Sequence, residues 1–117
     1  MELKGEAKLV RIIIGETDKI AHIPVYEKIV MEARKAGMAG TTVFKGIMGF
    51  GRNSRIHTAK ILRLSEDLPL IIEIVDELEK IKMFLPVLHD IFEEANCGGL
   101  VTLEKADVIK YIATKKV

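Results

Sequence analysis

Two glycines and two arginines lie close together near the middle of the chain, in the segment Gly49-Phe-Gly-Arg-Asn-Ser-Arg-Ile-His-Thr58. Gly49 and Gly51 can adopt positive φ, which lets successive backbone N–H groups converge on an anion. Arg52 and Arg55 could hold a phosphate or a carboxylate through paired hydrogen bonds. The segment is therefore a candidate anion-binding loop.

Other polar side chains of this segment fit the same chemistry. Ser54 and Thr58 offer hydroxyl groups, and His57 could add positive charge near neutral pH. The alternative is a solvated hairpin loop that displays its cations, because a lone pair of glycines separated by one residue occurs often by chance. Both interpretations stay open on these residues alone.

Charge is unevenly distributed around this loop. No acidic residue lies between Glu32 and Glu66, an interval that carries seven basic residues. From Glu66 to Glu104 there are ten acidic residues and two basic ones. The basic interval either meets an anion or attracts the acidic interval within the fold or between subunits.

Composition excludes several classes of protein. The chain has 117 residues, 49% of them hydrophobic, and a formal net charge of +1, which predicts one folded domain over residues 1–117 and no polycation for nucleic acid. Cys97 is the single cysteine, which fits a reducing compartment. The apolar runs are far shorter than the ~20 residues of a membrane span, and no signal peptide is evident. We expect a cytoplasmic protein that is not inserted in a membrane.

The first half of the chain alternates strand and helix patterns. Residues 7–14 are rich in valine and isoleucine and predict a buried strand. Pro24 suits a first helical turn, an apolar stripe recurs from Val25 to Ala33, and Gly37 is typical of a helix end. Residues 41–48 predict a second strand.

The second half repeats this order. Residues 68–75 form the clearest strand pattern, and Asp76 fits the N-cap of a helix that ends at residues 96–99. A fourth strand is expected over residues 100–103 and a further extended piece over 107–112. The buried helical stripe is expected to comprise Leu78, Ile81, Leu85, Leu88, Phe92 and Ala95, and core methionines to comprise Met31, Met38, Met48 and Met83.

The order β-α-β-β-α-β, with a C-terminal extended segment, predicts a ferredoxin-like two-layer α+β sandwich. Two helices cover one face of a four-stranded sheet. The other face carries Leu9, Arg11 and Ile13 from the first strand and Ile71, Glu73 and Val75 from the third. Because this face is mostly apolar, we expect it to be covered by another copy of the chain.

Several separated blocks resemble the PII signalling proteins. Gly40-Thr-Thr-Val43 and Gly49-Phe-Gly-Arg52 resemble the G-x-T-V and G-F-G-R-Q motifs of that family, and Val108-Ile-Lys110 is similar to its C-terminal V-I-R segment. The uncharacterised PII-like domain family is more similar still. The matching blocks are Gly46-Ile-Met-Gly-Phe-Gly51, Ile56-His-Thr58, Leu62-Arg-Leu-Ser65 and Asp67-Leu-Pro69.

The resemblance implies a homotrimer that is not an enzyme, requires no cofactor and binds ATP, ADP or AMP in clefts between subunits. It also implies that a loop over residues 49–65 contacts a regulated protein, for which a membrane transporter or channel is one candidate. The ligand-binding residues that it implies are Thr42, Gly49, Gly51, Arg52, Asn53, Gly98, Gly99 and Lys110, to which the loop chemistry adds Arg55 and His57.

Two positions depart from the PII pattern. Asn53 stands where glutamine is usual, and Gly99 stands where a phosphate-binding lysine is usual. A smaller or different anion is therefore as reasonable a ligand as ATP. The alternative function is a ligand-independent trimeric adaptor for a membrane transporter. An enzyme is the least favoured class, because no nucleophile–base pair or metal cluster is evident.

Overall fold

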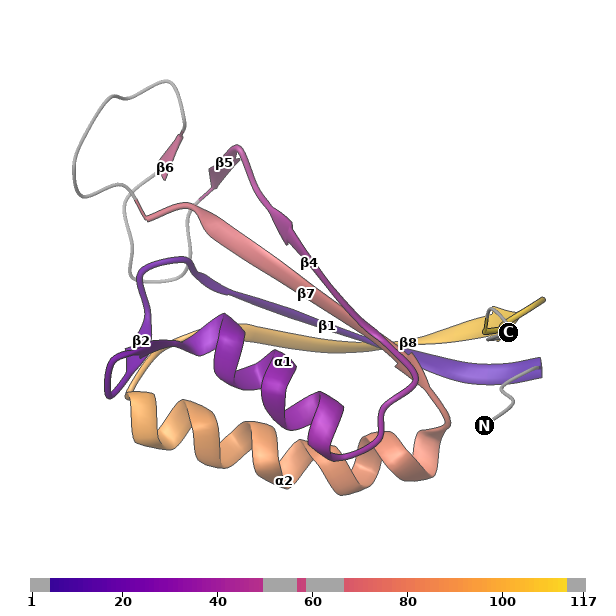
Figure 1. Cartoon of the computed structure of the whole chain (residues 1–117). Helices are drawn as coiled ribbons and strands as arrows, with labels where there is room; N and C mark the ends of the chain where they lie inside the picture. Colours follow the sequence, from indigo (N-terminus) through magenta and orange to yellow (C-terminus); the bar gives the residue numbers. More distant parts are fainter. Residues whose placement is uncertain (1–4, 50–56, 59–66, 114–117) are drawn as a thin grey trace.

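The computed structural model describes residues 5–49, 57–58 and 67–113 (Figure 1). The elements in chain order are β1 (Gly5–Gly15), β2 (Lys19–Ile20), β3 (Ile23–Pro24), α1 (Val25–Lys35), β4 (Thr41–Lys45), β5 (Met48–Gly49), β6 (His57–Thr58), β7 (Pro69–Asp76), α2 (Leu78–Ala95) and β8 (Leu100–Val108). Both helices lie on the same side of the main sheet. The expected ferredoxin-like α+β sandwich is confirmed.

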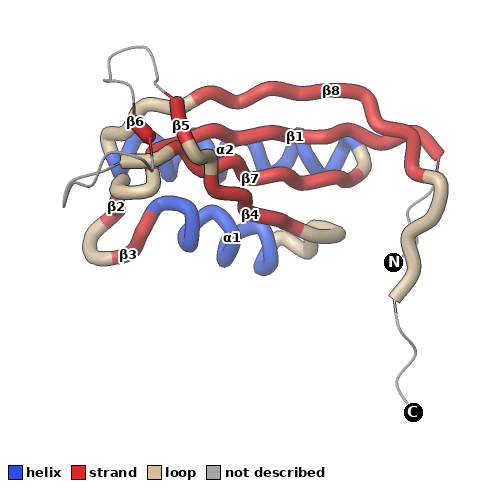
Figure 2. The backbone as a smooth tube through the Cα atoms, turned by 90° about the horizontal axis from the view of Figure 1, so that it is seen from above, coloured by secondary structure: helices blue, strands red, loops and turns tan. Residues whose placement is uncertain are grey.

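The main sheet has four antiparallel strands in the order β4-β7-β1-β8. The view from above shows these strands side by side over the helices (Figure 2). β1 pairs with β7 so that Ile12 lies opposite Ile72, and with β8 so that Ile12 lies opposite Val101. The two central strands are the two that the sequence marks most strongly, because both of their faces are largely apolar.

The face of the sheet toward the helices forms the core. Alternate residues of β1 and β7 are buried there, as the alternation predicts. α1 buries Val25, Ile29 and Ala33 against this face. The remaining core side chains are Val10, Ile12, Ile14, Ile20, Leu70, Ile72, Ile74, Ile81, Phe84, Leu88 and Ile91.

Neither α1 nor α2 lies over the opposite face of the sheet (Figure 1). Leu9, Ile13, Ile71 and Val75 are only half-buried on this face. Phe44 of β4 and Leu100 of β8 extend the same apolar row and are about half exposed, at 47% and 55%. This surface is called the open face below.

The helix ends follow local chemistry, with one shift from expectation. Gly37 has a φ of 74° just after α1, as expected for a helix end. α2 begins one residue later than predicted, because its N-cap is Glu77. Asp76 is instead the last residue of β7, fully buried, and its carboxylate accepts the backbone N–H groups of Ala39 (2.8 Å) and Glu77 (2.7 Å). None of the helices in the described ranges is long and apolar enough to cross a membrane.

The C-terminal strand differs from expectation. β8 is one continuous strand of nine residues, whereas the sequence predicts two shorter extended pieces. The reason is its partner, since β1 offers backbone groups from Gly5 to Ile13 and holds the polar residues of β8 in the ladder. Residues 109–113 are outside any strand.

Some expected core residues are exposed. Met31, Met48 and Met83 are all exposed, and only Met38 packs against the core. Leu85 is also exposed, at 37%, because the buried stripe of α2 runs through Phe84 instead. The methionine expectation was wrong for three of four residues, because Met31 and Met83 lie on the outer faces of α1 and α2 and Met48 lies in the short strand β5 away from the core.

Candidate ligand-binding site

A cavity of about 350 Å³ lies where β4 begins and β8 ends. This volume falls in the lower part of the range for small-molecule sites, about 300–1,000 Å³. Its lining residues are Ala39, Gly40, Thr41, Thr42, Glu73, Val75, Val108, Lys110 and Tyr111. The cavity therefore combines a carboxylate, an ammonium group and hydroxyls with apolar walls.

Two of these residues are cross-strand neighbours on the open face. Thr42 of β4 lies opposite Glu73 of β7, and Glu73 in turn lies opposite Arg11 of β1. The guanidinium of Arg11 donates from Nε to Oε2 of Glu73 at 2.9 Å, and its second nitrogen lies 2.9 Å from the same oxygen. Glu73 therefore belongs both to the cavity and to a charged cluster on the open face.

Arg11 has a second carboxylate partner on the other side. The Nη1 atom of Arg11 lies 3.3 Å from Oε1 of Glu104 on β8. The hydrogen bond that Arg11 donates to Glu73 is the main cause that raises the pKa of Arg11, and the carboxylate of Glu104 raises it further. The guanidinium is thus a permanent cation that links three strands of the sheet.

The segment after β8 forms one wall of the cavity. Lys110 and Tyr111 come from this segment, which continues beyond the end of the ladder. The hydroxyl of Tyr111 donates to the backbone carbonyl of Ala39. Because the N–H of Ala39 donates to the buried carboxylate of Asp76, the wall is anchored to the core.

The glycine of the loop stem has an extended backbone. Gly49 pairs with His57 in the short β5–β6 ladder and does not use the positive φ that a glycine can adopt. A ladder residue must be extended, which excludes the left-handed conformation. Its neighbour Pro69 gives a different reason for glycine, because a Cβ at Gly49 would lie 3.2 Å from Cγ of the proline ring.

The two glycines after α2 have different surroundings. A Cβ at Gly99 would lie 2.8 Å from Cε1 of Phe92 and 3.0 Å from the carbonyl oxygen of Ile13. Gly98 has nothing within 4 Å of the corresponding position. Close packing therefore explains why Gly99 carries no side chain at the position where a lysine is usual in PII proteins.

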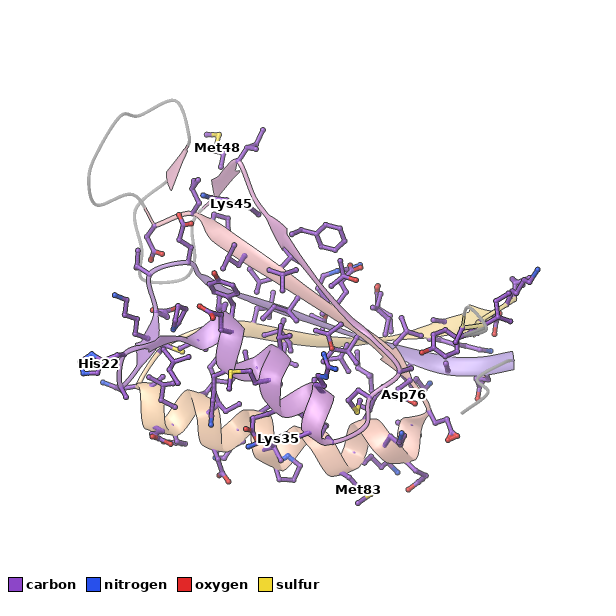
Figure 3. The ribbon with its side chains drawn as sticks, viewed as in Figure 1. His22, Lys35, Lys45, Met48, Asp76 and Met83 are labelled. Carbon is purple, nitrogen blue, oxygen red and sulfur yellow. The ribbon has the colours of Figure 1, made fainter. Side chains whose placement is uncertain are left out.

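The sequence-predicted residues fall into two groups at opposite ends of the sheet. Thr42 and Lys110 share the cavity. Gly98 and Gly99 precede β8, whose first residue pairs with Ile13 rather than with the start of β1. Figure 3 shows the same separation, with Lys45 and Met48 near the loop stem and Asp76 at the far end of the sheet.

Four predicted residues lie outside the described part of the chain. They are Gly51, Arg52, Asn53 and Arg55, and the structure describes His57 only as a backbone partner of Gly49. One protomer therefore brings together two of the predicted residues, Thr42 and Lys110, and holds the described glycines elsewhere.

Sequence reasoning missed Glu73, Arg11 and Tyr111 as residues at or beside the site. A signal existed for the first two. Arg11 and Glu73 are each flanked by apolar residues in the chain, and alternation places them on the same face of the sheet. Opposite charges at matching positions of neighbouring strands indicate a cross-strand pair. The sequence around Tyr111 contains no comparable signal.

The described residues offer little other chemistry. They include no group of three or more histidine, cysteine, aspartate or glutamate side chains that could hold a metal ion. Burial raises the pKa of the Cys97 thiol, and the nearby carboxylate of Asp18 raises it further. Cys97 is therefore a packed thiol that stays protonated at neutral pH, not an activated nucleophile.

Residues 7–108 match the family described as DUF190, Uncharacterized ACR, COG1993. Two curated relatives carry the name UPF0166 protein. One, from Aquifex aeolicus (strain VF5), is 37% identical over 102 residues, which are 87% of this chain and 92% of the relative. The other, MJ1524 from Methanocaldococcus jannaschii, is 35% identical over 105 residues, which are 90% of this chain and 94% of the relative.

A solved structure shows the same fold. It is CPII, a nitrogen regulatory PII-like protein from Thiomonas intermedia K12, bound to ADP, AMP and bicarbonate. The two chains superpose with a TM-score of 0.68 at 19% identity, over 90% of each chain. At this identity the likeness shows a PII-like fold. The family match and the two curated relatives show that this chain belongs to the DUF190 family.

Proposed function

We propose that this chain is the subunit of a homotrimeric PII-like regulatory protein, and not an enzyme. It binds a nucleotide or another anionic metabolite in clefts between copies and requires no resident cofactor. Residues 49–65 contact a partner protein, and this contact signals whether the cleft holds a ligand. We also propose that residues 1–117 form a single domain that works in the cytoplasm, where the one cysteine stays reduced.

The position of the cavity at the border of the open face is the observation that carries this proposal. Thr42 and Glu73 line the cavity and also belong to the open face. On the same face lie Ile13, Ile71 and Val75, which are only half-buried. A second copy on this face would bury these apolar side chains and add a wall to the cavity.

The separation of the predicted residues supports a cleft between copies. Thr42 and Lys110 lie at one end of the sheet, and Gly49, Gly98 and Gly99 belong to the other. These groups cannot contact one ligand within a protomer. Side-by-side packing of copies lets the glycine turn of one subunit approach the cavity of the next.

The nature of the ligand follows from the lining and from the fold. The cavity offers a hydroxyl, a carboxylate and an ammonium group beside apolar walls, which suits a heterocycle better than a bare anion. CPII was solved with ADP, AMP and bicarbonate, which supports a panel of these molecules together with ATP. Arg52, Asn53 and Arg55 are the proposed phosphate contacts.

The loop stem supports a contact with a partner protein. Ile47 and Met48 stand at the stem with exposed fractions of 79% and 61%. Exposed apolar side chains next to a cationic loop are typical of protein-binding surfaces. A membrane transporter or channel is the partner class that we propose.

Two measurements test the proposed function together. Light scattering behind a sizing column gives the mass of the assembly, and isothermal calorimetry against ATP, ADP, AMP and bicarbonate gives the ligand. We expect a trimer that binds at least one nucleotide with a stoichiometry of one per subunit. A monomer, or a trimer that is silent with all four molecules, would contradict the proposal.

A ligand-independent trimeric adaptor is the second candidate. The observation that favours it is the packing at Gly99, which leaves no room for a phosphate-binding cation there. A trimer that is silent in calorimetry but co-purifies with a membrane protein would identify this second function.

A further inference from the structure

The carboxylate of Glu73 faces two functional surfaces at once. It lines the cavity, and it holds Arg11 in the middle of the open face. Arg11 does not line the cavity. Glu73 therefore connects Arg11 to the cavity.

The two oxygens of this carboxylate are used unequally. Both short contacts from Arg11, at 2.9 Å each, go to Oε2 of Glu73. Within the described part of the chain, Oε1 has no hydrogen-bond partner. An ionised carboxylate can accept several hydrogen bonds, so Oε1 keeps its capacity to accept an N–H group from a bound molecule.

Arg11 is itself fixed from the other side. The Nη1 atom of Arg11 lies 3.3 Å from Oε1 of Glu104 on β8. A guanidinium is planar and presents its donors in a rigid fork, so two carboxylates on either side restrict its rotation. A fork that is fixed in this way also fixes the carboxylate that it holds.

We propose that Arg11 is a positioning residue for ligand binding, which orients the carboxylate of Glu73 so that Oε1 accepts a hydrogen bond from an N–H donor of the bound heterocycle. This inference rests on the proposed function, because it assumes that the cavity holds the ligand. It assigns a role to a residue that does not line the cavity.

A double-mutant cycle separates this role from a purely structural one. The variants are Arg11→Met, Glu73→Gln and the double variant, with calorimetric affinity for ADP as the readout. We expect each single variant to weaken ADP binding by about tenfold, the effect of losing one hydrogen bond to a charged group. The double variant should match Glu73→Gln within about twofold, because Arg11 acts only through that carboxylate.

Two controls keep the cycle interpretable. Lys105→Met removes a neighbouring cation whose ion pair with Glu6 spans 3.2 Å, and it should leave ADP affinity unchanged. The mass of every variant is measured, since Arg11 lies on the face where copies are proposed to meet. If Arg11→Met changes the mass, Arg11→Lys, which keeps the cation but not the fork, takes its place in the cycle.

Each outcome decides the question. Losses that add, to about a hundredfold in the double variant, would overturn the proposal, because Arg11 would then act independently of Glu73. An unchanged affinity in Glu73→Gln would overturn it as well. If the wild-type chain binds none of ATP, ADP or AMP, the nucleotide site of the proposed function fails together with this role of Arg11.

Discussion

Gly99 packs against the edge of the Phe92 ring, so closely that a Cβ at this glycine would lie 2.8 Å from Cε1 of the ring. On the other side the carbonyl oxygen of Ile13 would lie 3.0 Å away, and a backbone atom of a central strand has little freedom to shift. The turn between α2 and β8 therefore leaves no room for a side chain at Gly99. A side chain at position 99 would therefore have to displace the Phe92 ring or the backbone of Ile13.

Gly99→Ala should destabilise the protein for this reason. We expect a loss of about 1–3 kcal/mol in the free energy of unfolding, the usual cost of overpacking. Gly98→Ala is the matched control, because nothing lies within 4 Å of its Cβ position, and it should change stability by less than about 0.5 kcal/mol. Urea unfolding followed by circular dichroism measures both. Equal losses in the two variants would contradict the packing account.

The cationic loop gives a prediction about binding. Arg52→Ala should weaken binding of ADP by about tenfold or more, since the loss of a charge-assisted contact with phosphate is costly. Arg34→Ala removes an exposed cation in the last turn of α1 and should have little effect. Calorimetry on both variants at the same salt concentration makes the comparison. Similar losses in both would indicate non-specific electrostatic attraction.

The carboxylate of Asp18 gives a prediction about pH. Its pKa is raised mainly by burial and also by the nearby carboxylate of Asp67. The folded protein therefore binds this proton more tightly than the unfolded chain, and the contribution of Asp18 to stability falls as pH rises through the interval just above about pH 4. Asp18→Asn keeps an oxygen for the N–H of Gly15 and removes the charge.

We expect Asp18→Asn to be slightly more stable than the wild type at pH 7, by less than about 1 kcal/mol because solvent screens this group. The difference should shrink as pH falls through about 4 and vanish near pH 3, where the aspartate is almost fully protonated in both states. Urea unfolding across pH 3–7 would show this convergence. A variant that is less stable than wild type at pH 7 would show that the hydrogen bond outweighs the buried charge.

The open face gives a prediction about assembly. Ile71 is half-buried on this face and lies opposite both Ile13 and Phe44. Ile71→Asp would place a charge among apolar side chains of two copies, so it should dissociate the assembly. Met83→Asp is the matched control, because Met83 is 78% exposed and points away from the sheet on α2 (Figure 3). An unchanged mass for Ile71→Asp would place the interface elsewhere.

The sequence predicts the layers well, because residues 7–14 and 68–75 are rich in branched apolar side chains and α1 carries a regular apolar stripe. Val25, Ile29 and Ala33 were expected in the core and are fully buried. The prediction was weaker where an edge strand is polar. Nothing in Glu104, Lys105 and Ala106 marks a strand, and their ladder depends on the length of β1.

The candidate site was predictable only in part. Thr42 and Lys110 were expected from motif similarity and share the cavity. Gly49 can adopt positive φ, yet a ladder with His57 extends its backbone, which the sequence does not predict. Tyr111 lies at the cavity through a contact with Ala39, 72 residues away in the chain, and local sequence carries no signal for such a contact.

The mass of the wild-type protein in solution tests the central claim most directly, since the cleft exists only if copies cover the open face. Light scattering behind a sizing column, at micromolar subunit concentration and moderate salt, measures that mass without a ligand. We expect three times the subunit mass of 13.1 kDa. A mass equal to one subunit would contradict it, because the open face would then be bare and the cavity would lack its second wall.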